Sequence, residues 1–68
     1  MEQLKKARIA LGLKQNEVAR SANISTSYYN EIEKGKKKPS YEVMKRIAIV
    51  LRSDPTTLFY ASEFAYSE

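Results

Sequence analysis

The stretch that decides the fold is LKQNEVARSANISTSYYNEIEKGKKKPS, residues 13–40. Its residue types predict two short helices, over residues 15–21 and 26–34, with Asn23 between them. Asn is the non-glycine residue that best tolerates a left-handed backbone, so a sharp turn is expected at this position. The stretch therefore predicts a helix, a tight turn and a second helix in immediate succession.

The second of these helices is expected to have one polar and one apolar face. Ser25 is a typical N-cap in front of it, and Gly35 is a typical left-handed residue behind it. At about 100° per residue, one arc of about 140° carries only polar side chains. The residues on this arc are Thr26, Ser27, Asn30, Glu31 and Lys34, and those opposite are Tyr28, Tyr29 and Ile32. Such a helix fits the major groove of DNA, because its polar tips reach base edges and flanking lysines reach phosphates.

Residues before this stretch predict a first helix. Leu4, Ala7 and Leu11 recur at helical spacing, and Ile9 is expected near the same side of that helix. Gly12 follows in the usual position for a helix C-terminus. The N-terminal segment is therefore expected to be amphipathic, with this apolar side toward the core.

Two more helices are expected after Pro39, through which a helix cannot continue. Ser40 is expected to cap a fourth helix, and Asp54 with Pro55 to begin a short fifth helix that ends near Tyr60. No segment alternates in polarity for long enough to predict a strand. The chain is therefore expected to be all-α.

The composition limits the size and the chemistry of the chain. With 68 residues there is room for one domain, which buries only about 60% of the surface that the unfolded form exposes. We expect this domain to span residues 1–60, with residues 61–68 as a tail that extends an interface with a second copy. The chain has no Cys and no His, which excludes disulfides, thiol nucleophiles and the usual zinc and haem ligands.

Charged and apolar residues are unevenly distributed along the chain. The longest aliphatic run, residues 47–51, is far shorter than the ~20 residues that a membrane span needs, so we expect a cytoplasmic protein. Residues 1–52 hold all 12 basic residues and five of the eight acidic ones, a net charge of +7, whereas residues 53–68 carry −3. The basic part predicts a polyanion as partner, and the acidic end predicts a separate task.

The stretch quoted above, with KKARIALG before it and EVMKRIAIVL and DPTTLF after it, resembles the Cro/repressor-type helix-turn-helix family. Lambdoid phage repressors and many small XRE-like bacterial regulators belong to this family. The resemblance covers residues 3–60 and implies a compact five-helix, lambda repressor-like DNA-binding domain with the helix-turn-helix at helices two and three. It also implies that the small Ala19 lets these two helices pack, and that Tyr29 and Ile32 are core residues.

The resemblance and the polar arc together predict two sets of DNA contacts. One set reads base edges and the other binds backbone phosphates. The base readers are Thr26, Ser27, Asn30 and Glu31, and the phosphate ligands are Lys14, Gln15, Tyr28, Lys34, Lys36 and Lys38. The family also often has an ion pair between the positions of Arg8 and Glu33, which ties the first helix to the third.

Each of these expectations has an alternative that involves no DNA. The lysines at 36–38 could form a solvated basic loop, and Thr26 and Ser27 could simply favour the first helical turn. Glu31 could pair with Lys34 at i+3. Asn30 could be a plain solvent-facing residue, Tyr28 a core or interface residue, and Arg8 and Glu33 independent surface charges.

Three residues depart from the family's usual pattern. Asn23 and Arg52 stand where Gly is usual, so the fourth helix is expected to be less sharply capped at Arg52. Ile49 is apolar where a polar residue is usual, and several aromatic residues remain beyond the need of a five-helix core. We therefore expect a homodimer whose interface contains Ile49, Phe59, Tyr60, Phe64 and Tyr66.

These observations predict a sequence-specific DNA-binding transcriptional regulator, and specifically a dimeric repressor that inserts its third helix in the major groove of a two-fold operator. The alternative is a protein-interaction module, such as an antagonist of a related regulator or an antitoxin component. An enzyme is not expected, because without His, Cys or a phosphate loop the carboxylates and lysines form no catalytic constellation. We also expect no cofactor, metal or small-molecule ligand.

Overall fold

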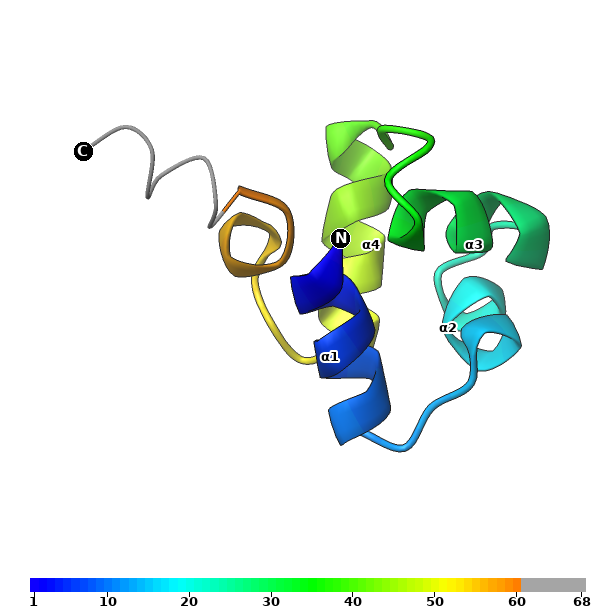
Figure 1. Ribbon diagram of the computed structural model, residues 1–68, viewed down its shortest axis with the longest axis vertical. Coiled ribbons are helices and arrows are strands. Elements are labelled where there is room, and N and C mark those ends of the chain that lie inside the picture. The colour runs from blue at the N-terminus through cyan, green and yellow to red at the C-terminus, as the bar shows by residue number, and fades with distance from the viewer. Residues whose placement is uncertain (61–68) are drawn as a thin grey trace.

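The computed structural model describes residues 1–60, all of which lie in helices or in the turns that join them. The elements are α1 (Glu2–Ala10), α2 (Gln15–Ser21), α3 (Thr26–Glu33), α4 (Tyr41–Val50) and a short π-helical turn, η1 (Thr56–Tyr60). Figure 1 shows α2 and α3 together on one side of the molecule, with α1 and α4 in the middle and η1 on the other side. The expected all-α, five-helix fold is confirmed. Within the described part, every helix is too short and too polar to traverse a bilayer.

All four α-helices end in the same way. After each C-cap, one residue with positive φ turns the chain, and two backbone N–H groups reach back to the last helical turn. At α4 the N–H of Arg52 donates to Ile49 over 3.2 Å and that of Ser53 to Ala48 over 3.0 Å. The four turning residues are Gly12, Asn23, Gly35 and Arg52, with φ of 71°, 60°, 78° and 56°.

The end of α4 corrects one expectation. Arg52 adopts the left-handed backbone although it is not glycine, so this end is capped by the same hydrogen bonds as the other three. The reason is tertiary: the chain must reverse here to place η1 against α1, and that packing imposes the conformation on Arg52.

Side-chain caps define where three of the elements begin. Ser25 Oγ accepts a hydrogen bond from the N–H of Tyr28 over 3.1 Å at the start of α3, and Ser40 Oγ accepts one from Val43 over 3.2 Å at the start of α4. Asp54 accepts from the N–H of Thr57 over 2.8 Å before η1. These are the caps that the sequence predicts, and each satisfies a donor that the helix itself leaves free.

The core receives apolar side chains from all five elements. The contributing residues are Leu4, Val18, Ala19, Ala22, Tyr29, Ile32, Met44, Ile47, Ala48, Leu51, Leu58 and Phe59. Ala19 is 1% exposed, and both Tyr29 and Ile32 are fully buried. The small residue and the two core residues that the resemblance implies are therefore inside the molecule.

Two apolar residues differ from expectation. Ile9 is 56% exposed, because at about 100° per residue it lies roughly 140° around α1 from the buried Leu4. The sequence predicts Phe59 at a dimer interface, yet it is 8% exposed and packs in the core of the monomer. The reason is that η1 packs against α1 and brings Phe59 inward.

Candidate nucleic-acid interface

The outer face of α3 is polar and accessible. Thr26 and Ser27, in its first turn, are exposed, and Asn30 and Glu31 in the next turn are half-buried. Together with Gln15 of α2, these four side chains line a shallow open depression of about 450 Å³. The structure thus brings the four expected base readers and one expected phosphate ligand to a single surface, which we call the α3 face.

Exposed lysines flank the elements that carry the α3 face. There are five of them: Lys14 before α2, Lys34 at the end of α3, and Lys36, Lys37 and Lys38 in the loop that follows. Lys37 Nζ lies 3.9 Å from Glu31 Oε1, and the two side chains are 57% and 42% exposed. An exposed pair of this kind contributes little to stability. The partner of Glu31 is therefore Lys37, in place of the Lys34 that its helical spacing favours.

Tyr28 stands at the border of this surface. Its side chain is half-buried and packs against the core, and its backbone N–H donates to the N-cap Ser25. Tyr28 does not line the depression of the α3 face, so its phosphate contact stays a prediction from the sequence.

Arg8 of α1 and Glu33 of α3 form an ion pair beneath this face. Arg8 Nε donates to Glu33 Oε2 over 2.7 Å and Nη2 to Oε1 over 3.2 Å. Their side chains are 12% and 5% exposed, so the pair is largely removed from solvent. Arg8 Nη1 also donates to the carbonyl of Leu13 over 2.9 Å, which fixes the turn before α2. The two residues are thus in direct contact and are not independent surface charges.

Two further donors to Glu33 were not anticipated from the sequence. Tyr29 Oη donates to Glu33 Oε2 over 2.7 Å, and Gln15 Nε2 donates to Oε1 over 2.9 Å. Asn30 Nδ2 in turn donates to Gln15 Oε1 over 2.9 Å. The i, i+4 spacing of Tyr29 and Glu33 was a signal for the first contact. Nothing local connects Gln15 to Glu33, because that contact depends on how α2 packs on α3.

The protonation states in this network follow from its geometry. Burial alone would raise the pKa of Glu33, but hydrogen bonds from Arg8, Tyr29 and Gln15 outweigh burial and lower this pKa below its ordinary value. Burial, followed by the hydrogen bond to Glu33, raises the pKa of Tyr29. The hydrogen bond to Glu33 also raises the pKa of Arg8. At neutral pH Glu33 is therefore an ionised acceptor surrounded by protonated donors.

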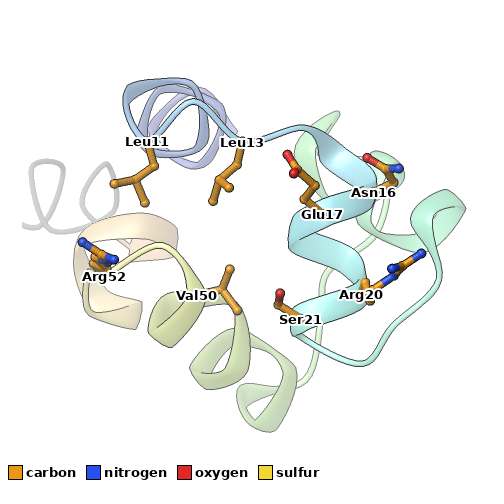
Figure 2. Close-up of a pocket in the computed structure, with 8 residues that line it drawn as sticks. All are labelled: Leu11, Leu13, Asn16, Glu17, Arg20, Ser21, Val50 and Arg52. Atoms are coloured by element: carbon orange, nitrogen blue, oxygen red, sulfur yellow. The ribbon is translucent and has the colours of Figure 1, made fainter.

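A larger hollow lies elsewhere on the molecule. It measures about 710 Å³ and opens between the end of α1, α2 and the end of α4 (Figure 2). Leu11, Leu13 and Val50 form its apolar part, while Arg20 and Arg52 stand among its polar residues. None of its lining residues belongs to α3, so this hollow is separate from the α3 face.

The residues expected at a dimer interface have different positions. Ile49 is 77% exposed on α4, whereas Tyr60 is half-buried and its hydroxyl donates to Met44 Sδ over 3.4 Å. Phe59 is in the core, as described above, and Phe64 and Tyr66 lie outside the described residues. Sequence analysis overlooked Tyr41, which is 61% exposed and stands eight residues before Ile49, about 80° away around α4.

Comparisons with known proteins place the chain among helix-turn-helix proteins. The helix-turn-helix family matches residues 4–58. The chain is 46% identical over 56 residues to the uncharacterized HTH-type transcriptional regulator YqaF of Bacillus subtilis, which covers 82% of this chain and 74% of that protein. It is 41% identical over 49 residues to the transcriptional regulator ClgR of Mycobacterium tuberculosis, which covers 72% of this chain and 44% of that protein. No solved structure gives a significant match.

Two helices joined by a tight turn, the second with a polar and accessible face, define a helix-turn-helix domain. The family match spans nearly all of the described residues, so this chain belongs to the Cro/repressor-type helix-turn-helix family of DNA-binding, non-enzymatic domains. The resemblance noted from the sequence is confirmed. The chain spans less than half the length of ClgR, so the similarity to that protein concerns only part of it.

Proposed function

We propose that this chain is a cytoplasmic, sequence-specific transcriptional regulator that binds a two-fold operator as a homodimeric repressor. The observation that carries the proposal is the α3 face, where exposed and half-buried polar side chains are bordered by lysines. The names of YqaF and ClgR, both transcriptional regulators, agree with this function. Double-stranded DNA is therefore the proposed partner, and repression follows from occlusion of a promoter.

In this proposal, α3 enters the major groove with its N-terminus toward the bases. Thr26 and Ser27 are in the first turn and exposed, so they reach base edges first. Asn30 and Glu31 follow one turn later and are half-buried. Glu31 suits a cytosine N4 amine, which is a donor, and its ion pair with Lys37 offsets its repulsion of phosphates.

Phosphates are contacted from both ends of the motif. Lys14 and Tyr28 serve at the N-terminal side, and Lys34, Lys36 and Lys38 at the C-terminal side. Gln15 uses one N–H toward Glu33, and its second N–H is left for a phosphate oxygen. These contacts set the register of the protein on DNA, but they do not distinguish one base sequence from another.

The proposed dimer interface lies on the outer face of α4. Ile49 and Tyr41 are large, exposed side chains of α4, and Tyr60 at the end of η1 is half-buried and joined to Met44 of α4. A two-fold pair would bury the same patch from both copies and hold the two α3 helices one DNA turn, about 34 Å, apart.

Selection of bound sequences from a random DNA pool tests the proposed function. We expect enrichment of a two-fold site, and an affinity that falls with salt with a log–log slope of about −0.9 per neutralised phosphate. Binding to no member of the pool, or an affinity independent of salt, would contradict the proposal. In that case a protein partner for the α3 face becomes the better hypothesis.

A further inference from the structure

The hydrogen bonds beneath the α3 face run in one direction. Glu33 is an ionised carboxylate and can only accept, so every group that contacts it must donate. Its two oxygens already receive donors from Arg8, Tyr29 and Gln15. The amide of Gln15 is therefore oriented with its nitrogen toward Glu33, and the reverse orientation would place its carbonyl oxygen against a negative charge.

The orientation of Gln15 determines that of Asn30. Because its nitrogen is held by Glu33, Gln15 presents Oε1 to Asn30. Asn30 Nδ2 donates a hydrogen bond to this oxygen over 2.9 Å. If Asn30 turned its amide over, two carbonyl oxygens would face each other. The buried charge of Glu33 thus fixes the orientation of both amides, one after the other, and leaves Asn30 with Oδ1 and one N–H unused.

We propose that Gln15 is a positioning residue for DNA recognition, which holds the Asn30 amide in one orientation so that this residue selects adenine. The inference rests on the proposed function, because it requires that the α3 face enters the major groove. Asn30 is half-buried in the depression that Gln15, Thr26 and Ser27 also line, so its unused groups lie at this surface.

The fixed orientation matters because the bases differ in their donors and acceptors. Adenine presents a donor at N6 and an acceptor at N7, which match Oδ1 and the remaining N–H of Asn30. Guanine presents acceptors at both O6 and N7, so a fixed Oδ1 would face O6. A freely rotating amide could turn its NH₂ group toward O6 and tolerate guanine. The contact with Gln15 removes this freedom, so the discrimination of adenine from guanine depends on Gln15.

Base preference in four variants tests this inference. Asn30→Ala identifies the base pair concerned, because preference at that position is lost. At this position we expect the unmodified chain to favour adenine over guanine by at least about tenfold. We expect Gln15→Met to reduce this ratio below about threefold while preferences at other positions remain. The matched control is Asn16→Met, the exposed neighbour in α2 outside the network, and it should leave the ratio unchanged.

The fourth variant shows whether Gln15 acts through Asn30. In the Asn30→Ala background, Gln15→Met should produce no further change in preference at this base pair. If Gln15→Met weakened binding equally for all four bases at this position, the inference would be overturned, because Gln15 would then be a phosphate ligand only. A preference for guanine at the position, or no position affected by Asn30→Ala, would overturn it as well.

A measurement without DNA separates this inference from the proposed function. By NMR, the side-chain NH₂ protons of Asn30 should exchange with solvent more slowly than those of Asn16, and Gln15→Met should remove the difference. Equal exchange in the unmodified chain would overturn the inference whatever the DNA result. If the chain bound no DNA although Asn30 was protected, the proposed function would fail and the selection of adenine with it, while the network itself would stand.

Discussion

At the scale of single residues, Glu33 is the centre of the hydrogen-bond network that joins the helices. It is 8% exposed, yet it accepts hydrogen bonds from Arg8 on α1, Gln15 on α2 and Tyr29 on its own helix. A buried carboxylate is costly unless its lone pairs are satisfied, and here each oxygen receives two donors. The residue therefore joins three helices through one charge, and removal of any partner leaves part of that charge uncompensated.

Substitution of Arg8 tests this view of Glu33. Arg8→Ala should lower the free energy of unfolding by about 3 kcal/mol, because it leaves a buried charge without its cation. Lys5→Ala is the control, since Lys5 is an exposed residue of the same helix and should change stability by less than about 0.5 kcal/mol. Urea denaturation of both variants measures the difference. Equal shifts of the two midpoints would show that the ion pair does not stabilise the fold.

The lowered pKa of Glu33 also makes stability depend on pH. A carboxyl group whose pKa is lowered by folding stabilises the native state above its ordinary pKa of 4.5, and this stabilisation is lost as the pH falls through the lower folded-state value. Glu33→Gln should therefore flatten the decline of thermal stability below pH 4.5. Asp54, whose pKa is lowered chiefly by the backbone hydrogen bond from Thr57, should retain its own contribution to that decline. An unchanged pH profile in the variant would rule out this role for Glu33.

At the scale of secondary structure, the four helices end through the same arrangement with different residues. Gly12 and Gly35 adopt positive φ without steric cost, whereas Arg52 adopts it with a β-carbon present. A left-handed backbone costs a non-glycine residue about 1–2 kcal/mol. A glycine at the same position avoids this cost but loses more conformational entropy on folding, which offsets part of the gain. The end of α4 is therefore the least favourable of these turns.

This difference predicts a stabilising substitution. Arg52→Gly should increase the free energy of unfolding by about 0.5–1 kcal/mol, and for so small a domain each ~1 kcal/mol raises Tm by about 4–8 °C. Arg52→Ala is the control, because it removes the side chain but keeps the β-carbon that causes the strain. Thermal denaturation followed by circular dichroism compares the two. If Arg52→Ala stabilised as much as Arg52→Gly, the gain would come from the lost side chain and not from the backbone.

On α3 and its following loop, residues at different positions should affect DNA binding in different ways. Ser27→Ala should relax the preference at one or two base pairs, since Ser27 is exposed in the first turn of the proposed recognition helix. Lys36→Ala should weaken binding to all DNA sequences about equally, and reduce the log–log slope of affinity against salt by about one. Fluorescence titrations against a set of single-base operator variants measure both effects. A Lys36 variant with altered preference and a Ser27 variant without it would reverse the two roles.

The elements also show what the sequence could and could not predict. Ser25, Ser40 and Asp54 were identified as caps because capping chemistry acts within three residues along the chain. The end at Arg52 was misjudged, because there the packing of η1 on α1 overrides a local preference. At the site, the pairing of Arg8 with Glu33 came from the family resemblance. The roles of Gln15 and Tyr29 in that network depend on how three helices pack, which no local pattern reveals.

At the scale of the whole molecule, two properties point toward association. A domain of this size buries little core, and Phe59, predicted at an interface, is already used in that core. The apolar surface that remains is unevenly placed: Ile49 and Tyr41 are exposed on α4, and Ile9 is exposed on α1. The α3 face, in contrast, is polar and bordered by lysines, so DNA and a second copy would use different surfaces.

These two surfaces make the dimer testable. Ile49→Lys should abolish self-association, because it places two like charges at the centre of a two-fold interface, and it should weaken binding to a two-half-site operator far more than to a single half-site. Ile9→Lys is the matched control: Ile9 is 56% exposed against 77% for Ile49, and it lies outside the proposed interface. Sedimentation equilibrium of the unmodified chain and of both variants gives the answer. The interface on α4 would be wrong if the unmodified chain stayed monomeric at high concentration, or if Ile49→Lys associated as strongly as Ile9→Lys.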